Sequence, residues 1–277
     1  MTPAEYCQEK AAQSGSSFYY SFLFLPKPRR EAITALYAFC REVDDIADEC
    51  TDTSIARTKL EWWRTELTKT FAGQPSHPVS QALLPAIRAY DLAQEQFEEI
   101  IDGMEMDLQH VRYADFKALQ LYCYRVASVV GQLAAALFGY SDRKTLKYAH
   151  DLGMAFQLTN IIRDVGEDAR RNRIYLPQDE LARFGVSESD LLQGRLSDGF
   201  NDLMAYQVAR AREFYQLALQ ALPSQDRRSQ RPGLVMAAIY QKLLHEIERD
   251  GFHVLNQRIT LTPLRKLWIA WRTWVFS

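Results

Sequence analysis

The stretch QLTNIIRDVGEDARRNRIYLP, residues 157–177, decides how the rest of this chain is interpreted. It places Gln157, Asn160, Asp164 and Asp168 at spacings of three, four and four residues. On a helix these four side chains share one face. An ordinary amphipathic helix directs an apolar face to the core, whereas this face carries amides and carboxylates. The spacing therefore predicts a helix whose polar face binds a ligand.

The charges of this segment indicate what that ligand is. Two carboxylates one turn apart repel each other by about 0.2–0.5 kcal/mol in water, and by more when they are partly buried. Mg²⁺ binds oxygen ligands and would reverse that repulsion. Four arginines follow the stripe or lie within it: Arg163, Arg170, Arg171 and Arg173. Carboxylates for Mg²⁺ beside arginines indicate a site for a phosphorylated substrate, and the alternative for this segment alone is a solvated face with salt bridges.

A second acidic stripe lies more than a hundred residues earlier, in LYAFCREVDDIADE, residues 36–49. Asp44 and Asp48 are one turn apart, Asp45 is adjacent, and Arg41 and Tyr37 lie one and two turns before Asp44. Two such helices can face each other across one cavity and hold Mg²⁺ ions between them. Such a cluster would stabilise a diphosphate as a leaving group.

Composition restricts the class of protein. Among 277 residues, 47% are hydrophobic and 25% charged, which is typical of a globular chain, and the net charge of −2 argues against a nucleic-acid partner. The four cysteines and five histidines show no metal-ligand spacing, so reduced thiols in the cytoplasm are expected. The N-terminus has no secretory signal, and the longest charge-free run, residues 126–141, is shorter than a membrane span. The protein is expected to be soluble or peripheral.

Periodicity predicts an all-α fold in one domain, residues 1–277, because no stretch alternates polar and apolar residues as a strand does. Short helical pieces are expected near 178–193. Long helices are expected at about 29–50, 53–72, 80–109 with a possible break, 113–139, 141–169, 197–222, 233–256 and 263–276.

Two apolar segments complete the expected cavity. In SGSSFYYSFLFLPKPRR, residues 14–30, Ser16 and Ser17 can donate hydrogen bonds to an anion, and the aromatic residues that follow either line a cavity or form plain core. The segment LYCYRVASVVGQLAAALFG, residues 121–139, predicts a close-packed central helix, which would also form the wall of a narrow apolar tunnel containing Tyr122.

These segments together resemble the squalene/phytoene synthase family. The motifs that carry the resemblance are DDIAD within YAFCREVDDIAD and NIIRDVGED within residues 157–177, supported by SSFYYSFLFLP and YCYRVASVVG. It covers about residues 14–250. It implies an all-α isoprenoid-synthase fold with helices around a central cavity and the aspartates at its mouth.

The resemblance also implies roles for individual residues. Two or three Mg²⁺ ions, bridged by diphosphate, would be held by Asp44, Asp45, Asp48, Asp164 and Asp168. The catalytic residues would be Tyr37, Arg41, Tyr122, Arg163, Arg173, Tyr175 and Tyr240. The substrate-binding residues would be Ser16, Ser17, Phe18, Phe22, Ala127, Val130, Gly131, Gln157 and Asn160.

Within the family, GSSFYYSFLFLPKPRREAITALYAFCREVDD, residues 15–45, most resembles the bacterial presqualene diphosphate synthases of hopanoid pathways. This similarity implies the condensation of two farnesyl diphosphates to presqualene diphosphate, without NADPH, with downstream pathway enzymes as partners. The alternatives are a phytoene, dehydrosqualene or squalene synthase, and a non-catalytic lipid-binding protein.

The C-terminal segment LTPLRKLWIAWRTWVFS, residues 261–277, predicts an amphipathic helix rich in tryptophan and basic residues. Such a helix suits the inner face of the cytoplasmic membrane, where these residues are favoured. The alternative is a helix docked on the parent domain.

Overall fold

The computed structural model describes residues 1–13, 21–22, 24–109 and 112–276, and within these ranges the chain is helical. The described ranges contain no strand, only an isolated bridge between Arg112 and Ile174. The α-helices are α1 (Pro3–Gln13), α3 (Lys27–Glu49), α4 (Thr53–Phe71), α5 (Pro78–Tyr90), α6 (Gln94–Gln109), α7 (Phe116–Cys123), α8 (Val129–Phe138), α9 (Lys144–Arg170), α10 (Gln178–Arg183), α11 (Glu188–Leu192), α12 (Phe200–Ala221), α13 (Arg231–Arg249) and α14 (Pro263–Phe276).

All the long helices expected from the sequence are present, with two differences. The break expected within 80–109 is confirmed, because Asp91 adopts a left-handed conformation (φ 51°), ends α5 and separates it from α6. The helix expected to reach residue 256 ends at Arg249, and a 3₁₀ turn, His253–Leu255, follows it. The N-terminal helix α1 was not predicted.

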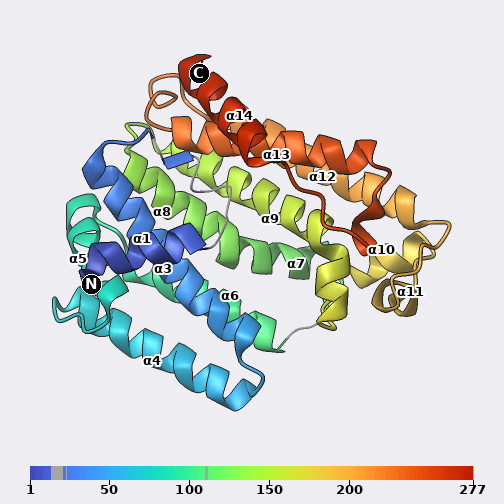
Figure 1. Ribbon diagram of the computed structural model, residues 1–277, viewed down its shortest axis with the longest axis horizontal. Coiled ribbons are helices and arrows are strands. Elements are labelled where there is room, and N and C mark those ends of the chain that lie inside the picture. Colours follow the sequence, from blue (N-terminus) through green and yellow to red (C-terminus); the bar gives the residue numbers. More distant parts are fainter. Residues whose placement is uncertain (14–20, 23, 110–111, 277) are drawn as a thin grey trace.

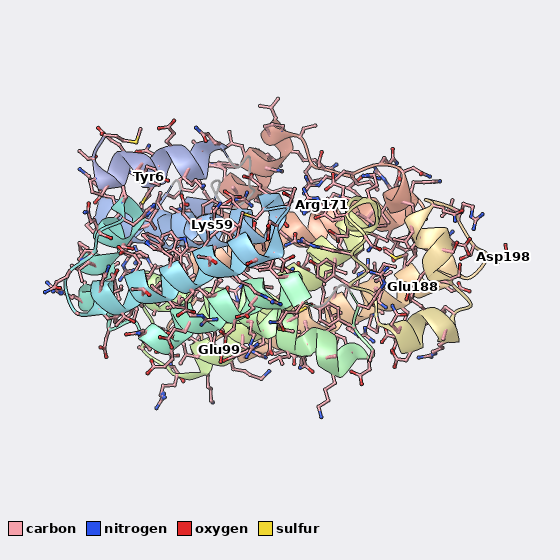
Figure 2. The ribbon with its side chains drawn as sticks, turned by 90° about the horizontal axis from the view of Figure 1, so that it is seen from below. Tyr6, Lys59, Glu99, Arg171, Glu188 and Asp198 are labelled. Carbon is pink, nitrogen blue, oxygen red and sulfur yellow. The ribbon has the colours of Figure 1, made fainter. Side chains whose placement is uncertain are left out.

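Helix α9, which carries the second acidic stripe, runs through the middle of the molecule (Figure 1). It contacts α12, α13, α8 and the turn that links α7 to α8. On one side of it lie α12, α13 and α14, and on the other side lie α3, α4 and α6 (Figure 1). Tyr6 of α1 and Asp198, after α11, mark opposite ends of the molecule (Figure 2). Helix α3, which carries the first acidic stripe, lies on the opposite side of α9 from α12 (Figure 1).

Two buried hydrophobic clusters meet at the helix formed by α7, a π turn (Tyr124–Ser128) and α8. One cluster surrounds α9, α12 and α13, the other surrounds α3 to α6, and Val126 contacts both. By length and composition alone, residues Phe116–Phe138 could cross a membrane, but half of their most apolar window is buried inside the protein. Packing between the two clusters accounts for the apolar character of this helix.

Two glycines let this helix approach α9 backbone to backbone. A Cβ atom on Gly153 of α9 would lie 2.6 Å from the carbonyl oxygen of Ala127, and one on Gly131 would lie 2.6 Å from that of Ala149. Real Cβ contacts are never this short, so larger residues would separate the two helices. This close approach positions the wall of the cavity described next.

Candidate active site

A cavity of about 290 Å³ lies between α3, α8, α9 and the beginning of α13. Eleven of the residues predicted for the site line it: Phe22, Tyr37, Arg41, Asp44, Tyr122, Ala127, Val130, Gly131, Gln157, Asn160 and Tyr240. Ser16, Ser17 and Phe18 lie outside the described residues. A larger groove of about 830 Å³ lies between α1, α3 and α5, but none of the five predicted aspartates lines it. The chemistry therefore belongs to the smaller cavity.

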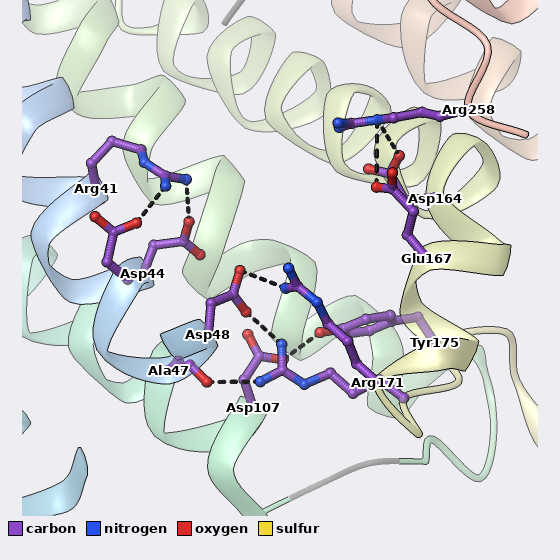
Figure 3. A network of polar contacts seen from close by, with 12 residues as sticks. Arg41, Asp44, Ala47, Asp48, Asp107, Asp164, Glu167, Arg171, Tyr175 and Arg258 are labelled. Atoms are coloured by element: carbon purple, nitrogen blue, oxygen red, sulfur yellow. Dashed lines mark hydrogen bonds and ion pairs between the residues drawn. The ribbon is translucent and has the colours of Figure 1, made fainter. Parts of the chain in front are cut away.

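The aspartates of α3 are held by basic side chains (Figure 3). The guanidinium of Arg41 bonds Asp44 at 2.6 Å and also bonds Asp45. Asp45 additionally pairs with Lys10 of α1 at 2.9 Å, and of the five predicted aspartates only Asp44 lines the cavity. Asp48 pairs with two arginines that follow α9, with Arg173 at 2.6 Å and with Arg171 at 3.0 Å. These last two ion pairs join the two acidic helices.

The aspartates of α9 have a similar arrangement. Asp164 accepts a hydrogen bond of 2.7 Å from Nε of Arg163 and pairs with Arg258 at 3.1 Å. Arg258 comes from the segment after α13 and also lies 3.5 Å from Glu167 (Figure 3). Arg258 is not among the residues predicted from the sequence, and no local pattern around it identifies it.

Burial raises the pKa of two of these carboxyl groups. The pKa of Asp44 rises to about 7 because the group is desolvated and because Asp48 lies near it. The pKa of Asp168 rises to about 8 because of desolvation and the charge of Asp164. Burial and mutual repulsion make the charged form of these carboxylates unfavourable. A bound cation would stabilise that charged form.

The residues present fit Mg²⁺ completed by a diphosphate. No three His, Cys, Asp or Glu side chains in the described ranges lie close enough together to form a metal cage. Mg²⁺ is commonly held by one or two carboxylates, with phosphate oxygens and waters completing its coordination. Two acidic stripes that face each other across a mouth rich in arginine match that mode of binding.

A buried carboxylate that was not predicted joins two of the predicted tyrosines. Asp107 of α6 accepts hydrogen bonds from Tyr122 at 2.9 Å and from Tyr175 at 2.7 Å, and the rings of the two tyrosines stack at 5.1 Å. Burial raises the pKa of Asp107 to about 6, although the tyrosine hydroxyls and the charge of Arg173 oppose the rise. The sequence did contain a signal for this residue. Asp107 is seven residues after Ile100 and three after Met104, on the apolar face of α6.

The polar wall of α9 continues beyond the aspartates. The amide of Asn160 donates a long hydrogen bond of 3.4 Å to Gln157, and the buried Oδ1 of Asn160 has no hydrogen-bond partner among the described residues. Arg163 bonds the hydroxyl of Tyr240, which brings α13 into the site. The mouth of the cavity thus combines carboxylates, guanidinium groups, an amide and hydroxyls.

The C-terminal helix α14 is both docked and amphipathic. Ala270 is fully buried, and Trp274 packs against Phe24 with 5.2 Å between ring centroids. Its other face exposes six large apolar side chains: Leu264, Leu267, Trp268, Trp271, Val275 and Phe276. The two alternatives considered for this segment are therefore compatible with each other.

Comparison with known proteins agrees with this geometry. The family profile described as squalene/phytoene synthase matches residues 11–265. A phytoene synthase from Arthrospira platensis is 38% identical over 95% of this chain and 89% of its own length. Among solved structures, a dehydrosqualene synthase in complex with a ligand superimposes with a TM-score of 0.88 at 26% identity, over 99% of this chain and 96% of that chain. The squalene synthase HpnC from Alicyclobacillus acidocaldarius gives a TM-score of 0.81 at 28% identity, over 90% and 94% of the two chains. The expected all-α isoprenoid-synthase fold is confirmed.

Proposed function

This chain belongs to the squalene/phytoene synthase family, and from that premise we propose that it condenses two farnesyl diphosphates head to head. The product is presqualene diphosphate, and one diphosphate is released. The observation that supports this reaction is an apolar cavity lined by Asp44, beside two acidic helices, α3 and α9, whose aspartates are paired with arginine. Prenyl tails fit the apolar walls, and the diphosphates fit the mouth.

Four of the aspartates are the proposed Mg²⁺ ligands: Asp44, Asp48, Asp164 and Asp168. When bound, Mg²⁺ would neutralise the charge of the diphosphate and make it a better leaving group. Asp45 was predicted as a fifth ligand. Its carboxylate is engaged by Arg41 and by Lys10 of α1, whereas Asp48 pairs with arginines that follow α9, so we assign Asp45 a supporting position on α3.

The remaining charged groups would bind and orient the substrates. Arg41, Arg163 and Arg173 already contact the aspartates and can transfer hydrogen bonds to diphosphate oxygens, which planar guanidinium groups bind well. The apolar walls exclude water, which would otherwise capture a carbocation. Tyr37, Tyr122, Tyr175 and Tyr240 would present hydroxyls and rings near the reacting carbons.

The bond changes balance without a further reagent. Departure of the first diphosphate leaves an allylic cation at C1, and the C2–C3 double bond of the second substrate attacks that carbon. The attack leaves a cation at C3 of the second substrate. Loss of a proton from C1 of the first substrate closes the cyclopropane between these two carbons, and the departed diphosphate accepts that proton. No nicotinamide cofactor takes part.

A second candidate is the same condensation with the C20 substrate geranylgeranyl diphosphate, followed by loss of the second diphosphate, rearrangement and loss of a proton, giving phytoene. The observation in its favour is the phytoene synthase name of a relative with higher sequence identity than the solved structures have. The first condensation is common to both candidates, so tail length and the loss of the second diphosphate are what separate them.

We further propose that α14 rests on the inner face of the cytoplasmic membrane, close to long-chain products that are poorly soluble in water. Its exposed face includes Trp268 and Trp271, stacked at 5.1 Å, and Arg272 is exposed beside them. Tryptophan and basic side chains favour the membrane interface.

One experiment tests the proposed function. The purified chain is incubated with Mg²⁺ and either the C15 or the C20 diphosphate, with and without NADPH, and the products are identified by mass spectrometry. The expected product is a phosphorylated cyclopropyl C30 compound that NADPH does not change. Squalene formed only with NADPH, or a C40 product made much faster than any C30 product, would contradict the assignment. Binding of both diphosphates without any product would indicate a non-catalytic lipid-binding protein.

A further inference from the structure

The end of the cavity farthest from the aspartates is closed by residues outside the sequence motifs quoted above. Helix α9 lines the cavity along much of its length, from Asn160 near the mouth to Tyr148. Sixteen residues separate Tyr148 from Asp164, and at about 1.5 Å per residue they span roughly 24 Å. Tyr148 therefore lies deep in the cavity, where the far end of a bound tail would reach.

The segment that leads into α13 seals this end. The side-chain amide of Gln230 donates hydrogen bonds to the carbonyl oxygens of Ala135 (3.1 Å) and Gly139 (2.9 Å), at the end of α8. These bonds tie α13 to α8. Gln230, Gly233 and Tyr148 all line the cavity, so the closure is part of its wall.

Tyr148 is wedged in one position. Its side chain is almost fully buried, and its hydroxyl has no hydrogen-bond partner among the described residues. A Cβ atom on Gly233 would lie 2.5 Å from that hydroxyl oxygen and 3.4 Å from Leu152. The backbone of α13 therefore blocks the ring on one side, and only a glycine at position 233 leaves it room. Contact with an apolar tail would not give this buried hydroxyl a hydrogen-bond partner either.

We propose that Tyr148, braced by Gly233, is the floor of the cavity and sets the longest prenyl tail that the site accepts. The inference rests on the proposed function, because it assigns the cavity to prenyl tails. It deepens that function by naming the residue that discriminates between a C15 and a C20 substrate. Apolar sites discriminate by about 10- to 200-fold for a single methylene, and a C20 tail is longer by a whole isoprene unit.

The test compares kcat/KM for the C15 and C20 diphosphates in the wild type and in variants that move the floor in opposite directions. Tyr148→Ala deepens the cavity and should raise the C20-to-C15 ratio by at least about tenfold. Gly233→Ala should push the hydroxyl into the cavity and lower the ratio. Tyr148→Phe keeps the ring and should keep the ratio. Phe200→Ala removes a buried ring outside the cavity, so it controls for loss of stability and should not alter the ratio.

A folded Tyr148→Ala protein with the wild-type ratio would overturn the proposal. If that variant does not fold, Gly233→Ala decides, because alanine favours helix more than glycine does, and an unchanged ratio there would equally overturn it. The change in ratio is measured whichever substrate the wild type prefers, so a wild type that prefers C20 contradicts the proposed C15 function without affecting this test. If neither substrate is converted, the same ratio is taken from calorimetric dissociation constants of the two diphosphates.

Discussion

The buried carboxylate of Asp107 accepts a 2.7 Å hydrogen bond from the hydroxyl of Tyr175, which lies 68 residues further along the chain. With the bond from Tyr122, it fixes both hydroxyls beside the cavity. Asp107→Asn keeps the shape but replaces one acceptor oxygen with an NH2 group, so one tyrosine hydroxyl must accept where it now donates, and its proton turns elsewhere. We expect kcat to fall by about 10- to 100-fold with little change in KM, from the loss of one hydrogen bond to a charged group. Steady-state kinetics and thermal unfolding, measured together, test this expectation.

A matched control for this change lies on the same helix. Asp102 pairs with Arg64 at 2.6 Å on the outer side of α6, away from the cavity. Asp102→Asn should therefore leave kcat near the wild-type value. Equal losses in the two variants would show that any acid removed from α6 has this effect, and the positioning role of Asp107 would be rejected.

Replacing a proposed metal ligand should abolish most turnover while the fold survives. Asp44→Asn and Asp164→Asn each remove a charge from the mouth, and we expect kcat to fall by about 10²- to 10³-fold. Asp45→Asn should cost much less, because that carboxylate is engaged by Lys10. Near-normal turnover of the first two variants at saturating Mg²⁺ would exclude the metal assignment.

The stability of the metal-free protein should fall as the pH rises from about 4 to about 8. Burial and the charge of Asp164 raise the pKa of Asp168 from 3.8 to about 8, so over this range the folded chain keeps a proton that the unfolded chain has lost. Asp168→Asn removes this group, and its free energy of unfolding should depend less on pH. Urea denaturation in EDTA at several pH values measures the difference. Parallel pH profiles for the two proteins would contradict the assigned shift.

Vesicle binding should depend on the exposed face of α14. Changing Trp268 and Trp271 together to glutamine should weaken binding to anionic vesicles by on the order of tenfold or more, with activity on detergent-dispersed substrate retained. Point substitutions are preferable to deletion of the segment, because Ala270 and Trp274 pack against the protein. The control is Trp62→Gln on α4, a similarly exposed tryptophan on another helix. Co-sedimentation that is equal for all three proteins would remove the support for a membrane surface.

Helix positions and eleven of the residues that line the cavity followed from the sequence, because both depend on local spacing. The stripe from Gln157 to Asp168 needs only the helical repeat to come together. Arg258 could not be predicted in the same way, since it reaches Asp164 from a segment without regular structure, 94 residues later. Its position depends on how α13 packs on α9, which no local pattern encodes.

Asp107 is an intermediate case. Its place on the apolar face of α6 is visible in the sequence, but a buried acid is informative only once its partners are known. Here the partners are two tyrosines from other elements, one on α7 and one after α9. Helix α1 was missed because its eleven residues include few large apolar side chains and give a weak periodic signal.

The π turn between α7 and α8 determines which side chains on either side of it face the cavity. The lining residues Tyr122, Val126, Val130, Ala134 and Phe138 recur every four residues, whereas an α-helix repeats every 3.6. Over sixteen residues at about 100° each, Phe138 would rotate to about 160° away from Tyr122 in an uninterrupted α-helix. The π turn holds one extra residue and takes back about one residue of that rotation. Deleting one residue from 124–128 would remove the π turn but leave Phe138 about 60° from Tyr122, the phase that the π turn already gives, so both halves of the wall would keep facing the cavity. Regular α-helix through 124–128 with every residue kept would instead turn one half of the wall out of the cavity.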